Sequence, residues 1–173
     1  LAHHRISSGN EQNIETLKNP DPTWESRAVT IANEGFEKHG IYYHSRRDPQ
    51  REAQSQIEHT LASEEGRTND QIKKHIVFLG AGVGYPLKEA LERSQVESVL
   101  VIETDPEVFY NCLSQINFSA VFSKGSKEIY FYYCPDPNID PLENILPFFQ
   151  NKNLDAFSVY QHRPSFQVPG SLF

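Results

Sequence analysis

The sequence predicts an α/β protein: a Rossmann-like three-layer domain with a mainly parallel sheet, preceded by a small helical N-terminal segment. Two observations lead to this prediction. From His75 onward, short apolar runs alternate with amphipathic segments, as in βα units on a parallel sheet. A glycine-rich loop directly follows the first of these runs. Because the chain is more polar before about residue 70, we predict an accessory segment over 1–70 and the α/β domain over 71–173.

Composition excludes several classes of protein. The 173 residues include 16 Lys and Arg and 23 Asp and Glu, so the formal net charge of −7 argues against a nucleic-acid partner. The chain is 38% hydrophobic and 12% aromatic, which is enough to build a core. Two cysteines cannot form a disulfide framework, and no apolar run approaches the roughly 20 residues that span a bilayer. We therefore expect a cytoplasmic protein without a membrane partner. Because there is no methionine, we expect it to be part of a longer chain.

Apolar runs that are too short for helices predict the strands of the sheet. Most of them are rich in β-branched or aromatic residues, as buried parallel strands are. In the usual 3-2-1-4 order the first and fourth strands are neighbours, and ligands bind outside the carboxyl ends of the strands at that point. The four runs are Ile76–Leu79, Val99–Ile102, Ile129–Tyr133 and Ala156–Tyr160.

Helices are predicted between the strands, where apolar residues recur at i, i+3, i+4 and i+7. Asp-Pro pairs precede several of these segments, as expected for an aspartate cap followed by proline in the first turn. The N-terminal part should contribute a short strand at 41–43 and a helix from Pro49 to about Ala62, packed on the sheet domain. The apolar sets are Leu87, Ala90 and Leu91; Phe109, Cys112, Leu113 and Ile116; and Leu142, Ile145, Leu146 and Phe149. The capping pairs are Asp48-Pro49, Asp105-Pro106 and Asp140-Pro141.

The strongest local signal is the segment HIVFLGAGVGYP, residues 75–86, in which a strand leads into Gly80, Gly82 and Gly84 and then into a helix. Glycines allow a tight turn close to a ligand, and the helix N-terminus offers free amides to an anion. Glu103 ends the next strand 23 residues after Gly80, close to the roughly 20 expected for a ribose-binding carboxylate. Tyr85 stands where the dinucleotide fingerprint has its third glycine, so the pattern is closer to the loop of S-adenosylmethionine methyltransferases. We predict a nucleotide or nucleotide-sugar ligand here; the alternative is a turn whose glycines serve packing.

A second predicted site lies after the fourth strand, at His162 and Arg163. If these residues face the glycine loop, Arg163 could bind a phosphate or carboxylate through two nitrogens, and His162 could transfer a proton near neutral pH. Both are equally compatible with a solvated loop. No set of residues has the spacing of a metal site, and no catalytic residue is assigned.

Two stretches together resemble one family. The first is GIYYHSRRDPQREA, residues 40–53, which resembles the "LHS-x-x-DP-x-x-EA" segment of motility accessory factor (Maf-like) flagellin glycosyltransferases. These bacterial proteins also carry a 6-hydroxymethylpterin diphosphokinase MptE-like domain. The second is FLGAGVGY, residues 78–85, followed by VIETDPEVF, residues 101–109, which is similar to their "G-x-G-x-G-Y" and "V-I-E-x-D-x-x-x-F" pattern. The resemblance covers roughly residues 36–163.

The resemblance implies a Rossmann-like N-terminal region ahead of a central domain. That central domain transfers a nonulosonic acid sugar from a CMP-activated donor to serine or threonine of flagellin. Its usual "G-P-S-L-D" loop is absent here, so the chain resembles the N-terminal portion alone. Gly80, Gly82, Gly84, Tyr85, Glu103 and Asp105 correspond to the motif of that portion and are expected to bind the ligand rather than to catalyse.

Two other functions stay open. One is an S-adenosylmethionine-binding, methyltransferase-like domain, although such folds usually have about seven strands and the sequence predicts four in the sheet region. The other is a non-catalytic interaction module in which the glycine loop is only a turn. We further expect the Glu103 carboxylate to face the crevice at the strand ends, where it would contribute little to stability.

Overall fold

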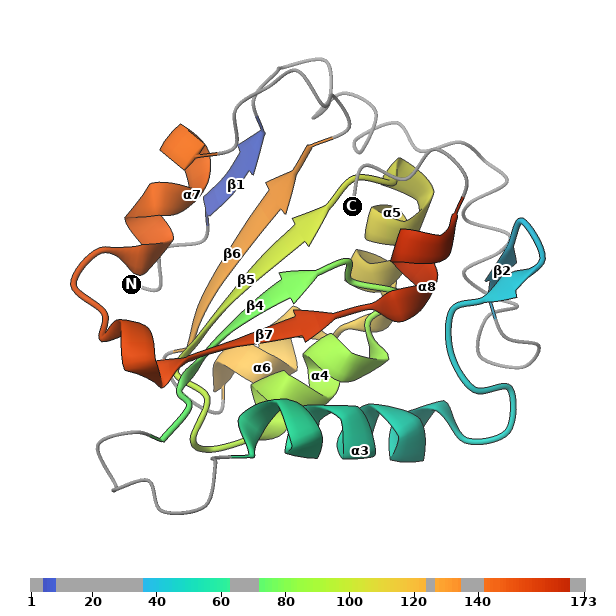
Figure 1. The fold of residues 1–173 in the computed structure, drawn as a ribbon, viewed down its shortest axis with the longest axis horizontal. Helices are drawn as coiled ribbons and strands as arrows, with labels where there is room; N and C mark the ends of the chain where they lie inside the picture. The colour runs from blue at the N-terminus through green and yellow to red at the C-terminus, as the bar shows by residue number, and fades with distance from the viewer. Residues whose placement is uncertain (1–4, 9–35, 63–71, 124–126, 135–141, 169–173) are drawn as a thin grey trace.

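The structure, a computed structural model, describes residues 5–8, 36–62, 72–123, 127–134 and 142–168. Figure 1 shows a central sheet with helices on both of its faces, the three-layer arrangement predicted from the sequence. The main sheet consists of β1 (Arg5–Ser8), β4 (His75–Leu79), β5 (Ser98–Glu103), β6 (Glu128–Tyr133) and β7 (Phe157–Gln161). A separate hairpin is formed by β2 (Glu37–Lys38) and β3 (Ile41–Tyr42). The helices are α3 (Pro49–Leu61), α4 (Tyr85–Glu92), α5 (Pro106–Gln115), α6 (Phe118–Ser123), α7 (Leu142–Phe149) and α8 (Arg163–Gln167), with a short 3₁₀ turn, η2 (Leu154–Ala156).

The strand order is β1-β6-β5-β4-β7, and every pairing in this sheet is parallel. The four strands predicted from the sequence therefore stand in the predicted 3-2-1-4 order. The sequence analysis did not predict β1, which adds a fifth strand beside β6, from the Arg5–Tyr130 pair to the Ser8–Tyr133 pair. Because the five strands of the main sheet are all parallel, their carboxyl ends lie along the same edge of that sheet.

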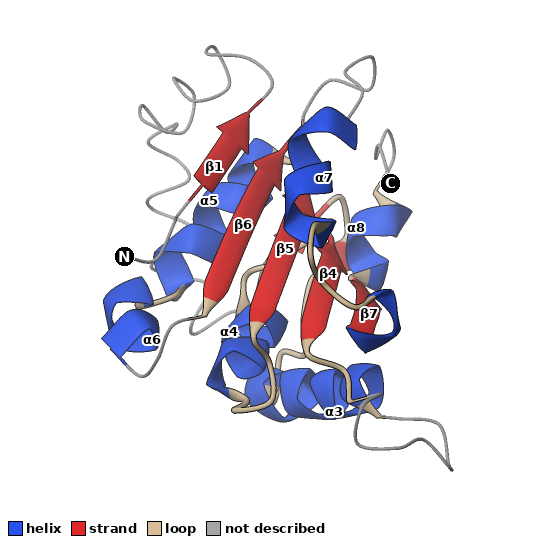
Figure 2. Cartoon of the chain, turned by 90° about the vertical axis from the view of Figure 1, so that its left-hand side faces the viewer, coloured by secondary structure: helices blue, strands red, loops and turns tan. Residues whose placement is uncertain are grey.

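The core forms on both faces of this sheet because side chains alternate along each strand. One face carries Ile76, Phe78 and Val99, which pack with helices α3, α4 and α5 in one buried cluster. The other face carries Val77 and Leu100, which pack against Phe148 of α7. Figure 2 shows α7 on one side of the sheet and α3, α4 and α6 on the other. Helix stability here comes mainly from burying these apolar faces.

The predicted caps at α3 and α5 are confirmed. Asp48 accepts a hydrogen bond from the Arg51 N–H at 2.9 Å, and Asp105 accepts from the first-turn amides of α5. The predicted pair at residues 140–141 lies outside the described residues.

The predicted apolar face of α7 is wrong in part. Leu142 and Leu146 are 55% and 52% exposed, whereas Phe148, which the pattern left out, is fully buried. The helix contacts the sheet near its C-terminal end, through Phe148 and Phe149. A periodic pattern gives the possible faces of a helix, and only the packing partner selects one of them.

The N-terminal elements pack on the sheet domain, as predicted. Ile57 of α3 belongs to the same buried cluster as β4 and β5, and the Tyr160 hydroxyl of β7 donates to Gln56 Oε1 at 2.8 Å. The boundary predicted near residue 70 falls outside the described residues and stays a prediction. Among the described helices, none has both the length and the apolar character needed to cross a bilayer.

Candidate functional site

The glycine loop joins β4 to α4 at the carboxyl edge of the sheet. Gly80, Gly82 and Gly84 all have positive φ, at 80°, 55° and 93°, a conformation that favours glycine. All five residues of the loop, 80–84, are buried. Three loop amides are used within the fold: Gly80 N–H donates to the Ile102 carbonyl at 2.9 Å, Gly84 N–H to the Ala81 carbonyl at 3.3 Å, and Ala81 N–H to a carboxylate at the end of β5. The predicted turn is therefore present, but it faces the interior of the protein.

Glu103 lies beside this loop because β4 and β5 are neighbouring strands. Its side chain is 1% exposed, and its carboxylate accepts three backbone hydrogen bonds, from Ala81 at 2.9 Å, Thr104 at 2.8 Å and Asp105 at 3.1 Å. The expectation that this carboxylate faces an open crevice is wrong. Burial raises the pKa of Glu103 to about 7, although the three amide donors favour the charged form. Glu103 instead holds the glycine loop against the loop that follows β5.

His162 covers the glycine loop from the end of β7. It is 3% exposed; Nε2 lies 2.9 Å from the Tyr43 carbonyl and Nδ1 lies 2.7 Å from Ser165 Oγ. A carbonyl can only accept, so Nε2 carries the proton and the Ser165 hydroxyl donates to Nδ1. Burial lowers the pKa of His162 to about 4, so the ring is neutral at physiological pH. It is neither a solvated loop residue nor placed to exchange protons with solvent.

The hairpin β2–β3 closes the remaining space over the loop. Phe36 and Tyr43 pack with Val83 of the glycine loop and Val108 of α5 in one buried cluster. A backbone hydrogen bond from Tyr43 N to the Phe36 carbonyl, at 2.9 Å, holds these two residues together. The N-terminal part of the chain thus occupies the edge of the sheet where Rossmann-like folds bind ligands.

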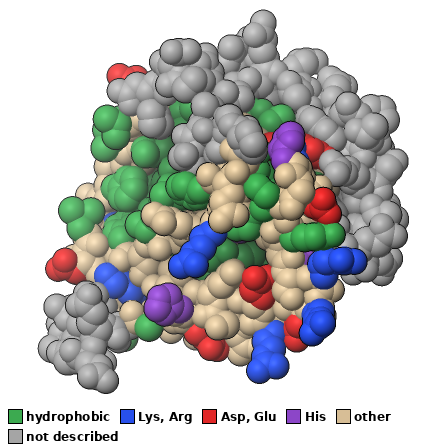
Figure 3. All heavy atoms as spheres, turned by 45° about the vertical axis from the view of Figure 1, so that its right-hand side comes forward, with side chains coloured by type: hydrophobic (Ala, Val, Ile, Leu, Met, Phe, Trp, Pro, Cys, Tyr) green, Lys and Arg blue, Asp and Glu red, His purple; other side chains and the backbone are tan. Residues whose placement is uncertain are grey.

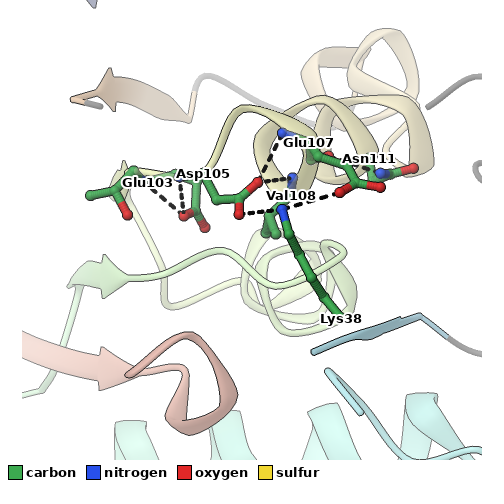
Figure 4. Close-up of polar contacts among 7 residues, drawn as sticks. Lys38, Glu103, Asp105, Glu107, Val108 and Asn111 are labelled. Atoms are coloured by element: carbon green, nitrogen blue, oxygen red, sulfur yellow. Dashed lines mark hydrogen bonds and ion pairs between the residues drawn. The ribbon is translucent and has the colours of Figure 1, made fainter. Parts of the chain in front are cut away.

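An ion-pair cluster ties the hairpin to the start of α5 (Figure 4). Lys38 Nζ lies 2.5 Å from Asp105 Oδ2 and 3.1 Å from Glu107 Oε2. Asp105 also caps α5, because its Oδ1 accepts from the amides of Glu107 and Val108 at 3.0 and 3.1 Å. Asp105 is thus both a helix cap, as predicted, and the partner of Lys38.

The structure brings together all but one of the predicted site residues. Tyr85 begins α4, and the centre of its ring lies 5.0 Å from the centre of the His44 ring. Its side chain also packs against the buried cluster formed by Phe36, Tyr43, Val83 and Val108. Arg163 is exposed and lines a cleft of about 660 Å³ between α3 and β7, whose lining also includes Tyr43 and His162. Arg163 is not part of the cluster that the other predicted residues form. Its members are Gly80, Gly82, Gly84, Tyr85, Glu103, Asp105 and His162.

The sequence analysis missed the residues that fill the site: Phe36, Lys38, Tyr43, Glu107 and Ser165. Only the predicted short strand at 41–43 pointed to any of them. Nothing local in a sequence tells which distant segment will cover a loop.

In this arrangement, groups that were expected to bind a nucleotide or S-adenosylmethionine make contacts within the fold. The Ala81 amide and the Glu103 carboxylate, which such a ligand would need, are bonded to each other. The space over Gly82 is occupied by the His162 ring. Ligand binding by these residues stays a prediction to which the geometry adds no support. Among the described residues, no group of His, Cys, Asp and Glu is arranged to hold a metal ion.

Gly82→Ala is expected to destabilise the domain strongly. A left-handed conformation costs an alanine about 1–2 kcal/mol, and the added Cβ would lie 2.7 Å from His162 Nε2, where something must move. Gly40→Ala is the matched control, because Gly40 also has positive φ (77°) but nothing lies within 4 Å of an added Cβ. Urea unfolding followed by circular dichroism should show a clearly larger loss for Gly82→Ala. Equal losses would mean that contact between the added Cβ and the His162 ring does not contribute to the loss of stability.

Fold and site together define a class: a Rossmann-like α/β domain in which the carboxyl edge of the sheet is filled by its own hairpin and by side chains at the start of α8. The profile of the family described as "Glycosyltransferase Maf N-terminal domain" matches residues 8–168. The chain belongs to this family, as the two motifs predicted. Comparison with curated proteins and with solved structures gives no match. The family's description does not mention an MptE-like domain, so that part of the resemblance stays a prediction.

Proposed function

We propose that this domain is a non-catalytic scaffold of a Maf-like glycosyltransferase that attaches a nucleotide-activated nonulosonic acid to flagellin, the transfer being carried out by another part of the protein. The observation that carries the proposal is the filled carboxyl edge of the sheet. There the carboxylate expected to bind ribose accepts three backbone amides of the fold. Family membership supplies the glycosyltransferase context.

The energetics support a closed edge. To admit a ligand, the domain would have to expose Phe36 and Tyr43, which are 2% and 4% exposed, and separate Lys38 from its two carboxylates. Burying an aromatic side chain of this size contributes about 1.5–3 kcal/mol. A ligand would have to offset this cost before gaining any affinity.

A thermal-shift experiment tests the proposal on this chain. CMP, a CMP-activated sugar, S-adenosylmethionine and NAD are added separately, and none is expected to raise the melting temperature. A ligand bound at 100 times its dissociation constant would add about 2.7 kcal/mol, which is readily detected. Stabilisation by CMP compounds would overturn the scaffold role in favour of nucleotide binding. Stabilisation by S-adenosylmethionine alone would favour the methyltransferase-like alternative.

A second test uses the whole glycosyltransferase in cells. Lys38→Met removes the cation of the filled edge, and Lys74→Met removes a surface lysine that pairs with Glu97 at 2.8 Å near the start of β4. If the domain is a scaffold, a strain that carries either variant should still modify flagellin, as judged from the mass of the purified flagellin. Loss of modification with Lys38→Met alone, at an unchanged protein level, would place a reacting or substrate-binding group at this edge.

A further inference from the structure

Among the strands that the structure describes, β7 lies at one edge of the main sheet and pairs with β4 alone. Two backbone hydrogen bonds show which of its residues face β4: His162 N–H donates to the Leu79 carbonyl and Lys74 N–H to the Ala156 carbonyl. Backbone groups of successive strand residues point to alternate sides, so the even-numbered positions face β4. Phe157, Val159 and Gln161 therefore direct their N–H and C=O groups to the outer side. There, no strand of the described part of the chain pairs with them.

Strand β7 itself carries none of the residues that usually protect an edge from pairing with another chain. Natural edge strands carry lysine or proline, contain a bulge, or are covered by another element. The sequence of β7, FSVYQ, has no charge and no proline. Val159 is 56% exposed, although valine favours the inside of sheets. The edge is therefore able to accept a further strand.

A groove runs alongside this edge. The cleft of about 660 Å³ is lined on one side by Val159, Tyr160 and Gln161, and on the other by a stripe of α3 that runs from Glu52 to Thr60. Figure 1 shows α3 extending beside β7. The eight steps along the helix from Glu52 to Thr60 cover about 12 Å, which matches about four residues of an extended chain at about 3.3 Å each.

The walls of the groove are held in place by hydrogen bonds. The Tyr160 hydroxyl donates to Gln56 Oε1 at 2.8 Å, which joins β7 to α3. Glu52 Oε2 accepts the Ser45 amide at 2.5 Å, which joins α3 to the loop after the hairpin. The groove is thus present before any partner binds, and a partner would not have to order it.

At its end near α8 the groove carries an arginine, Arg163; the one carboxylate among its described lining residues, Glu52, accepts the Ser45 amide. Arg163 is exposed and forms no ion pair with any described residue. Arg46 lies nearby, with its guanidinium 5.1 Å from the centre of the Tyr42 ring, and Tyr42 also lines the groove. Figure 3, which brings this side forward, shows apolar, basic and acidic side chains around a hollow. A partner that carries an acidic residue matches this end.

We propose that the outer edge of β7 binds an extended segment of a partner polypeptide as an additional strand, with an acidic residue of that segment next to Arg163 and Arg46. Main-chain hydrogen bonds to Val159 and Gln161 provide the affinity, and the groove beside α3 receives alternate side chains. The proposal goes beyond the scaffold role and does not depend on it, because it concerns the outer side of β7, whereas the scaffold role concerns the carboxyl ends of the strands. Tyr43 and His162 line the groove and also belong to the filled carboxyl edge.

Peptide binding tests the proposal, with fluorescence anisotropy as the readout. Three labelled hexapeptides in which threonine and valine alternate serve as probes. The first ends in aspartate and the second ends in lysine. The third has the sequence of the first, but its backbone amides are N-methylated. The aspartate peptide is expected to bind saturably, the lysine peptide at least about tenfold more weakly, and the methylated peptide not at all. If no peptide binds, or if the methylated peptide binds as well as its parent, the proposal is overturned.

Variants of β7 locate the binding. Val159→Pro removes an outward-facing N–H, so the sheet should stay folded while peptide binding is lost; proline is tolerated on edge strands in this orientation. Val159→Thr keeps the N–H and is the matched control, which should bind like the parent. Should Val159→Pro lower the melting temperature markedly, Val159→Lys provides the same test with a charge that protects the edge. Full binding by whichever of the two variants is folded would contradict the proposal.

A second copy of the chain is the other possible occupant of this edge. Sedimentation velocity over a range of concentrations distinguishes the two cases. A partner peptide should bind to a monomer. Concentration-dependent dimers that Val159→Lys abolishes, and that the peptides do not dissociate, would assign the edge to self-association and overturn the proposal of a partner.

Discussion

Glu103→Ala is expected to lower the free energy of unfolding by several kcal/mol. The substitution removes the acceptor of three backbone amides, those of Ala81, Thr104 and Asp105, in a site that is 1% exposed. A buried donor left without a partner costs about 1–3 kcal/mol, and a typical domain is stable by only about 5–15 kcal/mol. Urea unfolding at neutral pH, followed by circular dichroism, measures the loss.

Two controls make this result specific. Glu97→Ala removes a carboxylate that is 56% exposed and pairs with Lys74 just before the same strand, so its effect should stay within about 1 kcal/mol. Glu103→Gln keeps one acceptor oxygen but turns an amide group toward a backbone donor, so an intermediate loss is expected. If Glu103→Ala cost no more than Glu97→Ala, the carboxylate would be free, and a ligand role for it would regain support.

The second large effect concerns His162 and pH. Burial lowers its pKa to about 4, below the ordinary value of 6.5, so the unfolded chain takes up a proton before the folded one does. Stability from this residue is therefore complete above about pH 6.5 and is lost progressively as the pH falls toward 4. A difference of about 2.5 pH units corresponds to roughly 3 kcal/mol. Burial raises the pKa of Glu103 to about 7, so this carboxyl adds stability as the pH falls over the same range and opposes the effect of His162. The His162 contribution is therefore read as the difference in the free energy of unfolding between the parent chain and a variant without this histidine, measured between pH 7 and pH 4.5.

His162→Gln isolates this contribution. Glutamine can still donate to the Tyr43 carbonyl, but it does not titrate and cannot accept from Ser165 as the ring does. The variant should be less stable at pH 7 and lose less stability between pH 6.5 and pH 4.5. His59→Gln, at an exposed histidine of α3, should keep the pH profile of the parent chain. A profile for His162→Gln as steep as that of the parent would show that other groups cause the acid sensitivity.

These predictions reverse the role that the sequence alone favoured for the glycine loop. Gly80, Gly82 and Gly84 were expected to bring a backbone close to a ligand. In the structure they bring it close to His162, Ser165 and the helix α5. Both uses require a residue without a side chain and with positive φ, so a pattern of glycines cannot distinguish them.

The sequence by itself determined the parallel sheet, the order of four of its five strands, the starts of α3 and α5, and the family. These features depend on local properties: the length of apolar runs, the alternation of side chains along a strand, and aspartate beside proline at a helix start. Only the tertiary structure decided what covers the carboxyl edge of the sheet. Phe36, Lys38 and Tyr43 reach it from a hairpin, and His162 reaches it from β7. A carboxylate accepts hydrogen bonds from a ribose or from backbone amides equally well, and folding placed three amides within reach of Glu103.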